Sequence, residues 1–186
     1  SMPNVIVKNR SQVFGYYDHN MMVMFERTKD HIENPTEFTP RQRLWYIRAK
    51  EVIISTGSIE RPLVFGNNDR PGIILSSSIK KYLDYYSVKC GQKISLFTNN
   101  DSAYETAISL SNSGVTVNSV IDIRDKSNSS IVKQVGKLGI KIHWKHTVVN
   151  TNGYKKINSI ELMKLSDDGT GVIGNKLKEE CDCLGI

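Results

Sequence analysis

The sequence has no apolar run long enough to span a membrane, and it contains few cysteines. A membrane helix needs about 20 consecutive apolar residues, and no segment of the 186 residues approaches that length. No basic segment followed by an apolar one opens the chain, as a secretion signal would require. The three cysteines, Cys90, Cys181 and Cys183, offer neither a disulfide framework nor a zinc site. These absences predict a protein without membrane association, in a reducing, cytoplasmic compartment.

The chain also lacks a concentrated basic patch, although its net charge is +6, from 25 basic and 19 acidic residues. Its lysines are scattered, whereas a nucleic-acid surface needs contiguous basic residues interleaved with stacking aromatics. We therefore expect no nucleic-acid partner. The four histidines form no metal pattern, and His143 and His146, three apart on an expected strand, should point to opposite faces.

The first part of the chain, residues 1–57, contains β-type patterns and no helix of useful length. Strands are expected at 4–8, 21–27, 43–48 and 51–55, with a turn region at 14–19 and a loop at 34–40. The run at 51–55 is apolar and ends at Thr56 and Gly57, which is typical of a buried parallel strand. A polar connector that contains prolines follows at residues 58–72.

From residue 73 the pattern changes to alternating strands and helices. Helices are expected at 79–86, 102–113 and 129–138, with serines 76–78 as candidate N-caps and Gly114 and Gly139 as helix ends. Strands are expected at 93–97, 115–123 and 140–144, and near 157–165 and 172–178 around a hairpin signal at 167–171. The β-α-β-α-β order predicts a parallel sheet with right-handed crossovers. We therefore expect an α/β protein, with a three-layer Rossmann-like domain at 73–180 and an N-terminal antiparallel β segment.

The turn at residues 98–103 is the candidate binding site. A strand, a tight turn and a helix N-terminus present free backbone N–H groups to a phosphate. The dinucleotide fingerprint G-x-G-x-x-G/A reads T-N-N-D-S-A here, so the final small residue is present and both glycines are absent. Asn100 can still adopt the left-handed conformation that such a turn uses. The candidate pyrophosphate-binding residues are Thr98, Asn99, Asn100, Asp101 and Ser102.

A second signal is Asp122, at the end of the next expected strand. A carboxylate there can bind both hydroxyls of an adenosine ribose, which favours NAD over NADP. Arg124 favours the opposite choice, because an arginine can bind a 2′-phosphate. A purely structural interpretation also stands, in which Asp122 caps the following turn or pairs with Lys126 and the domain binds no nucleotide.

Several motifs resemble known flavoproteins. Residues 100–107 (N-D-S-A-Y-E-T-A) resemble the turn and helix of the NAD(P)-binding domain in thioredoxin-reductase-like proteins, and 48–57 resemble the strand that closes their FAD-binding half. Residues 14–20, 59–72 and 97–103 are together similar to the alpha subunit of heterotetrameric sarcosine oxidases. The resemblance covers most of residues 12–125. It makes 1–57 a remnant of a first, FAD-type dinucleotide fold and 181–186 the return towards that fold.

The resemblance implies a subunit of a flavoenzyme that oxidatively demethylates sarcosine to glycine with oxygen and tetrahydrofolate. It implies NAD, FMN and a folate-binding domain in the alpha subunit, FAD in the beta subunit, and beta, gamma and delta subunits as partners. The chain has no G-x-G-x-x-G before Arg48, no folate domain and no recognisable catalytic or flavin-attachment residue. We therefore expect a fragment that is inactive alone and binds NAD weakly at most.

Two alternatives stay open at this stage. One is the NAD(P)-binding domain of a related amine or opine dehydrogenase, or of a pyridine-nucleotide flavoprotein reductase. The other is a purely structural Rossmann module.

Overall fold

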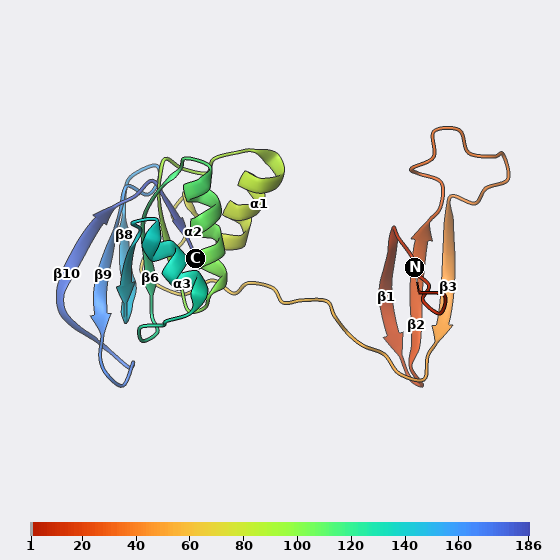
Figure 1. The fold of residues 1–186 in the computed structure, drawn as a ribbon, viewed down its shortest axis with the longest axis horizontal. Helices are drawn as coiled ribbons and strands as arrows, with labels where there is room; N and C mark the ends of the chain where they lie inside the picture. Colours follow the sequence, from red (N-terminus) through yellow and green to blue (C-terminus); the bar gives the residue numbers. More distant parts are fainter. Residues whose placement is uncertain (1) are drawn as a thin grey trace. The chain divides into compact units, whose positions relative to one another are not determined.

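The computed structural model describes residues 2–186. The chain divides into two compact units between Ser58 and Ile59 (Figure 1). This division lies one residue from the boundary expected between 57 and 58. No helix among the described residues is long and apolar enough to cross a membrane, and no group of His, Cys, Asp or Glu in residues 2–186 is arranged to hold a metal ion.

The first unit is a three-stranded antiparallel sheet in the order β1 (Ser11–Tyr17), β2 (Met21–Arg27), β3 (Gln42–Arg48). The strands predicted at 21–27 and 43–48 are confirmed. The turn predicted at 14–19 is wrong, because β1 continues to Tyr17. The reversal needs only residues 18–20, where His19 and Asn20 have positive φ angles of 58° and 53°. The aromatic run before it pairs with the apolar strand β2.

Two other strands predicted in this unit, at 4–8 and 51–55, are wrong. Neither segment pairs with a strand in the described part of the chain. Ile53 and Ile54 are 90% and 69% exposed. A β-branched run favours a strand only where a neighbour supplies hydrogen bonds and packing, and here the neighbour is missing.

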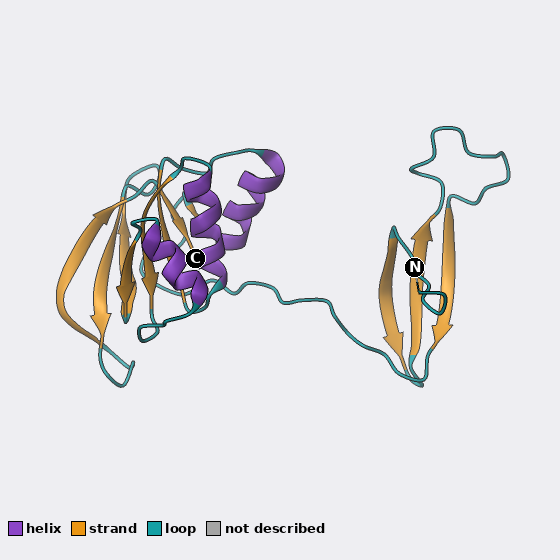
Figure 2. Cartoon of the chain, viewed as in Figure 1, coloured by secondary structure: helices purple, strands orange, loops and turns teal. Residues whose placement is uncertain are grey.

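The second unit has three layers (Figures 1 and 2). A parallel sheet in the order β4-β11-β5-β6-β7 forms the middle layer. Its strands are β4 (Ile73–Ile74), β5 (Lys93–Thr98), β6 (Thr116–Asp122), β7 (Lys141–Trp144) and β11 (Cys183–Gly185). Helices α1 (Ser76–Tyr86), α2 (Ser102–Asn112) and α3 (Ser130–Lys137) cover one face. An antiparallel sheet of β8 (His146–Asn152), β9 (Ser159–Leu165) and β10 (Val172–Glu180) covers the other. The predicted α/β, three-layer class is confirmed.

Two apolar cores fill the spaces between these layers. Leu96 and Val120 face the helices, while their neighbours Phe97 and Ile121 face the antiparallel sheet. Successive residues of a strand point to opposite faces, so a strand buried on both sides is mostly apolar, and its buried polar residues, such as Ser95 and Ser119, need hydrogen-bond partners. This explains why the middle strands lack the polar alternation of a surface sheet.

Residues 181–186 depart from the expectation that they leave the domain. β11 lies between β4 and β5 and pairs in parallel with both, so the segment completes the sheet of the second unit. A strand of three residues with distant partners leaves no periodic signal in the sequence. The two-residue β4 was missed for the same reason.

The start of α1 also differs from expectation. Its N-cap is Leu75, with no side-chain cap from the helix itself. The carboxylate of Glu60 instead accepts hydrogen bonds from the backbone N–H and the hydroxyl of Ser77. The helix ends at Gly114 and Gly139 agree with prediction, since both glycines have φ near +70°.

The path from β7 to β8 bends at Lys145, whose φ is +55°. This bend divides the segment into two strands in different sheets. It also brings the rings of His143 and His146 to 5.4 Å between centroids. The prediction that these rings face opposite sides is wrong, because it assumed one uninterrupted strand.

Candidate functional site at the ends of β5 and β6

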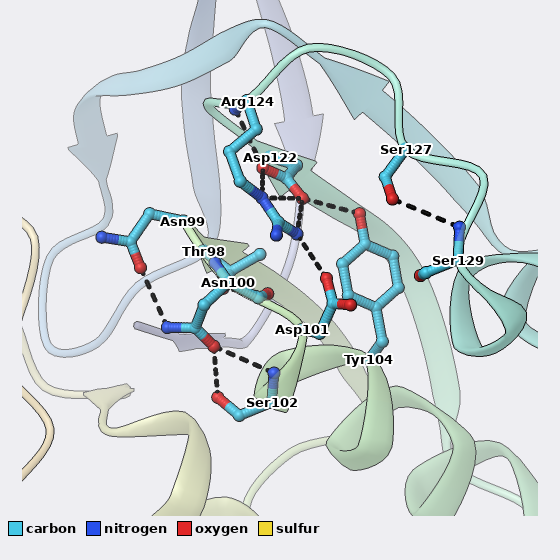
Figure 3. A network of polar contacts seen from close by, with 10 residues as sticks. All are labelled: Thr98, Asn99, Asn100, Asp101, Ser102, Tyr104, Asp122, Arg124, Ser127 and Ser129. Carbon is cyan, nitrogen blue, oxygen red and sulfur yellow. Dashed lines mark hydrogen bonds and ion pairs between the residues drawn. The ribbon is translucent and has the colours of Figure 1, made fainter. Parts of the chain in front are cut away.

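All six predicted site residues lie at one edge of the parallel sheet. Thr98 ends β5, Asp122 ends β6, and the two are register partners. The turn of residues 99–101 leads directly into α2 at Ser102. Figure 3 shows that these side chains form two neighbouring groups, one around Asn100 and one around Asp122. The structure therefore brings together the residues that the sequence selected.

Asn100 organises the turn by bonding to its own backbone neighbours. Its Oδ1 accepts hydrogen bonds from the N–H of Ser102 at 2.9 Å and from the Ser102 hydroxyl at 2.6 Å. The N–H of Asn100 donates to Thr98 Oγ1 at 3.1 Å, and its Nδ2 donates to Asn99 Oδ1 at 2.9 Å. Short polar side chains commonly close turns in this way. Two N–H groups of the turn are thus satisfied by the protein itself.

Asp122 is fully buried and all its contacts are internal. Its Oδ1 accepts from the backbone N–H of Arg124 at 2.9 Å, and Oδ2 accepts from the hydroxyl of Tyr104 at 2.8 Å. The guanidinium of Arg124 binds the same carboxylate, with Nη2 2.7 Å from Oδ2 and Nε 3.0 Å from Oδ1. The structural role considered for Asp122, capping the following turn, is present, and its ionic partner is Arg124 in place of Lys126.

Arg124 links the two groups. Its Nη2 also lies 2.8 Å from Oδ1 of Asp101, so one guanidinium bridges two carboxylates. The hydrogen bond to Asp122, and after it the one to Asp101, raises the pKa of Arg124, against the opposing effect of burial. Burial first, and then the hydrogen bond to Asp122, raises the pKa of Tyr104 far above its ordinary value. Near neutral pH, Arg124 is therefore a cation and Tyr104 a neutral hydrogen-bond donor.

In this arrangement, the groups that a dinucleotide would need are already bonded within the protein. A pyrophosphate needs bare backbone N–H groups at the turn, but Asn100 Oδ1 already occupies the N–H of Ser102. A ribose needs free carboxylate oxygens, and those of Asp122 are buried and bonded to Tyr104 and Arg124. The carboxylate of Asp101 adds negative charge beside the turn. As arranged, the site is closed by its own side chains.

Sequence reasoning missed Tyr104. It lies within the motif 100–107, but its hydroxyl has a role only because it donates to the buried carboxylate of Asp122 at the end of β6. Its ring stacks on Trp144 at 6.3 Å between centroids, so β7 also helps to fix it. A tyrosine on the buried face of a helix was the available signal, because a buried hydroxyl requires a partner.

The fold of this chain is similar to that of two oxidoreductases of known structure. Thioredoxin reductase from T. acidophilum is 23% identical, with a TM-score of 0.53, over 75% of this chain and 44% of that one. A pyridine nucleotide-disulfide family oxidoreductase from Enterococcus faecalis V583 is 12% identical, with a TM-score of 0.51, over 94% of this chain and 36% of that one. At these identities the likeness shows the fold alone.

Sequence similarity identifies the particular relatives. Sarcosine oxidase subunit alpha from Rhizobium meliloti (strain 1021) is 39% identical over 162 residues, 87% of this chain. The subunit of that name from Corynebacterium sp. (strain P-1) is 36% identical over 180 residues, 95% of this chain. The resemblance to sarcosine oxidase alpha subunits is thus confirmed. The chain spans only 16% and 18% of the length of these relatives, and no family model matches it.

Proposed function

We propose that this chain is a segment of the alpha subunit of a sarcosine-oxidising flavoenzyme, and that its Rossmann-like domain serves assembly and not catalysis. The hydrogen bond from the N–H of Ser102 to Asn100 Oδ1 carries the second part of this proposal. It places a protein oxygen where a phosphate oxygen would otherwise bind. The relatives that share 35–39% identity support the first part.

The complete enzyme of this proposal is cytoplasmic and heterotetrameric. It demethylates sarcosine with oxygen and tetrahydrofolate. It uses FAD, FMN and NAD, which bind to parts of the complex outside the residues described here. Its other subunits, beta, gamma and delta, are the partners of the alpha chain. The segment contributes a rigid α/β body to that assembly.

A pyridine-nucleotide disulfide reductase is the disfavoured alternative. Burial raises the pKa of Cys181 and of Cys183 to about 12, and burial also raises the pKa of Cys90. Disulfide exchange requires a thiolate. All three cysteines are therefore neutral thiols at physiological pH, which is unsuited to that chemistry.

Titration of NAD into the chain by calorimetry tests the closed turn. We expect binding weaker than about 1 mM, the weak end of specific recognition. Asn100→Gly frees the N–H of Ser102 and restores a glycine of the fingerprint, so it should tighten binding by about tenfold, the effect of roughly one hydrogen bond to a charged group. NAD that binds with its pyrophosphate at residues 99–102 would have to displace Arg124 and Tyr104 from Asp122 before its ribose could reach that carboxylate.

Asp122→Asn tests the ribose position separately, because it keeps the shape of the side chain and removes its charge. Micromolar binding to the unaltered chain would overturn the assembly role. Binding of that strength that Asp122→Asn leaves unchanged would also overturn the assignment of the site residues.

Activity of the purified chain tests the fragment directly. We expect no sarcosine oxidation and no flavin absorbance, because the chain has no glycine-rich loop before Arg48. A flavin band that co-purifies in stoichiometric amount would contradict this proposal.

A further inference from the structure

The first unit contains a cavity of about 370 Å³ that none of the preceding roles uses. It lies over one face of the β1–β2 pair, where Gln12 and Phe25 are direct cross-strand partners. The backbone extends this pairing by one step, since the N–H of Arg27 donates to the carbonyl of Arg10 at 3.0 Å. Asp30 and His31, from the loop after β2, also line it. The full lining is Arg10, Ser11, Gln12, Phe25, Arg27, Asp30 and His31.

The wall of this cavity carries unbalanced positive charge. In the described part of the chain, neither Arg10 nor Arg27 lies within ion-pair distance of a carboxylate. The acidic group of the wall, Asp30, is already neutralised from outside by Arg41, with Nε 2.9 Å from Oδ1. Arg10 and Arg27 therefore both line the cavity, and neither is paired with a carboxylate in the described residues.

The backbone of Arg10 is strained, and the guanidinium group of Arg27 lies over an aromatic ring. Arg10 has a φ of +53°, a left-handed conformation that costs a non-glycine residue about 1 kcal/mol or more. The guanidinium carbon of Arg27 lies 5.7 Å from the centre of the Phe25 ring, and that ring lies 6.3 Å from Phe14. Stacking of this kind fixes the plane of an arginine and lowers the entropy lost when it binds.

We propose that this cavity binds a small anion through a phosphate or carboxylate group held by Arg10 and Arg27. The planar guanidinium fork matches either group with two parallel hydrogen bonds. Gln12 adds a neutral donor, His31 adds a ring nitrogen, and Phe25 provides an apolar surface for the rest of the ligand. The volume lies within the range of small-molecule sites. The proposal is independent of the closed turn at 98–102, which belongs to the other compact unit.

Calorimetric titration of inorganic phosphate and of succinate, in separate experiments with the 186-residue chain, tests this site. We expect saturable binding to one site, weakened at least about tenfold in Arg10→Gln and in Arg27→Gln, because each removes a charge-assisted hydrogen bond. Arg48→Gln is the matched control: Arg48 is an exposed arginine of the same sheet outside the cavity, and its loss should leave binding unchanged. Binding of phosphate alone identifies a phosphate ligand, and binding of both shows that a carboxylate suffices.

A second measurement does not depend on the variants folding. Phosphate should shift the NMR signals of the His31 ring and of the Phe25 amide in the unaltered chain. Absence of saturable binding and of these shifts overturns the proposal. Equal weakening by Arg48→Gln also overturns it, because the attraction would then be a general effect of net charge.

Discussion

At the scale of single residues, Asn100 and Arg124 decide the character of the turn after β5. A glycine at position 100 would leave the N–H of Ser102 pointing outward, whereas the asparagine amide bonds to it. Arg124 in the same way occupies the carboxylate of Asp122, which would otherwise face a ribose. Two side chains thus convert the geometry of a nucleotide cradle into a closed, internally bonded corner.

Replacing Asn100 by alanine should lower the free energy of unfolding by about 1 kcal/mol, because the N–H and hydroxyl of Ser102 lose their acceptor. Urea denaturation followed by circular dichroism measures the change. Asn112→Ala is the control, since Asn112 is exposed at the end of the same helix and makes no comparable bond. Equal destabilisation by both variants would contradict the role given to Asn100.

Removing the hydroxyl of Tyr104 should also destabilise the chain, by about 1–2 kcal/mol. Tyr104→Phe leaves one buried oxygen of Asp122 with fewer donors, and an unsatisfied buried acceptor is costly. Tyr85→Phe provides the comparison, because Tyr85 is 77% exposed. A Tyr104→Phe protein as stable as Tyr85→Phe would show that Arg124 alone satisfies the carboxylate.

At the scale of elements, the sequence predicted the helices and strands whose pattern lies within consecutive residues, and it missed those that depend on distant partners. Helices α2 and α3 carry helical apolar periodicity and are followed by Gly114 and Gly139, strands β5 and β6 are short and largely apolar, and all four formed where expected. β4 and β11 are two and three residues long and exist only through partners distant in sequence. The site shows the same division: the turn 98–102 was found from local order, whereas Tyr104 needs the buried carboxylate of a neighbouring strand to reveal its role.

One element, β10, is held to the parallel sheet through Glu179. The carboxylate accepts hydrogen bonds from Ser95 at 2.9 Å and from Ser119, and it lies 3.2 Å from Nε2 of His143. Burial acts to raise the pKa of Glu179, but the hydrogen bonds from His143, Ser119 and Ser95 outweigh it and lower the pKa. The ionised form is therefore the one that stabilises the contact between the two sheets.

This lowered pKa predicts acid sensitivity. A carboxylate whose folded pKa is depressed adds stability above its unfolded pKa, and that stability is lost as the pH falls through the folded value. Stability should therefore decline below about pH 4.3, the ordinary value for glutamate, and Glu179→Gln should flatten this part of the profile. Denaturation curves between pH 3 and 7 measure it, with exposed Glu180→Gln as control. An unchanged slope in Glu179→Gln would rule out this origin.

At the scale of the whole molecule, the two units differ in how many hydrophobic residues each one buries. Val23 and Met24 are the buried hydrophobic residues described in the first unit, whereas the other buried hydrophobic residues lie in the second. The first unit also exposes large side chains such as Phe14 and Tyr46, at 56% and 70%. Burial of apolar surface is the main source of stability, so the second unit should supply nearly all of it.

Residues 59–186 alone should therefore melt within about 2 °C of the full chain, less than the shift expected for roughly 1 kcal/mol in a chain of this size. Scanning calorimetry of both proteins makes the comparison, and a single cooperative transition is expected in each. A fall of more than about 5 °C on removing residues 1–58 would show that the first unit contributes substantially.

The position of β11 also governs the order in which the molecule can be built. During synthesis β11 leaves the ribosome after every other strand described here, yet its place is between β4 and β5. Until then, the facing edges of those two strands have unpaired N–H and C=O groups, which can pair wrongly with other chains. Gly185 allows the late insertion to close tightly, since a Cβ there would lie 2.5 Å from Leu96 and 2.9 Å from Ile79. The last strand to be synthesised thus inserts into the middle of the sheet, and its pairing with β4 and β5 joins segments that are far apart in the sequence.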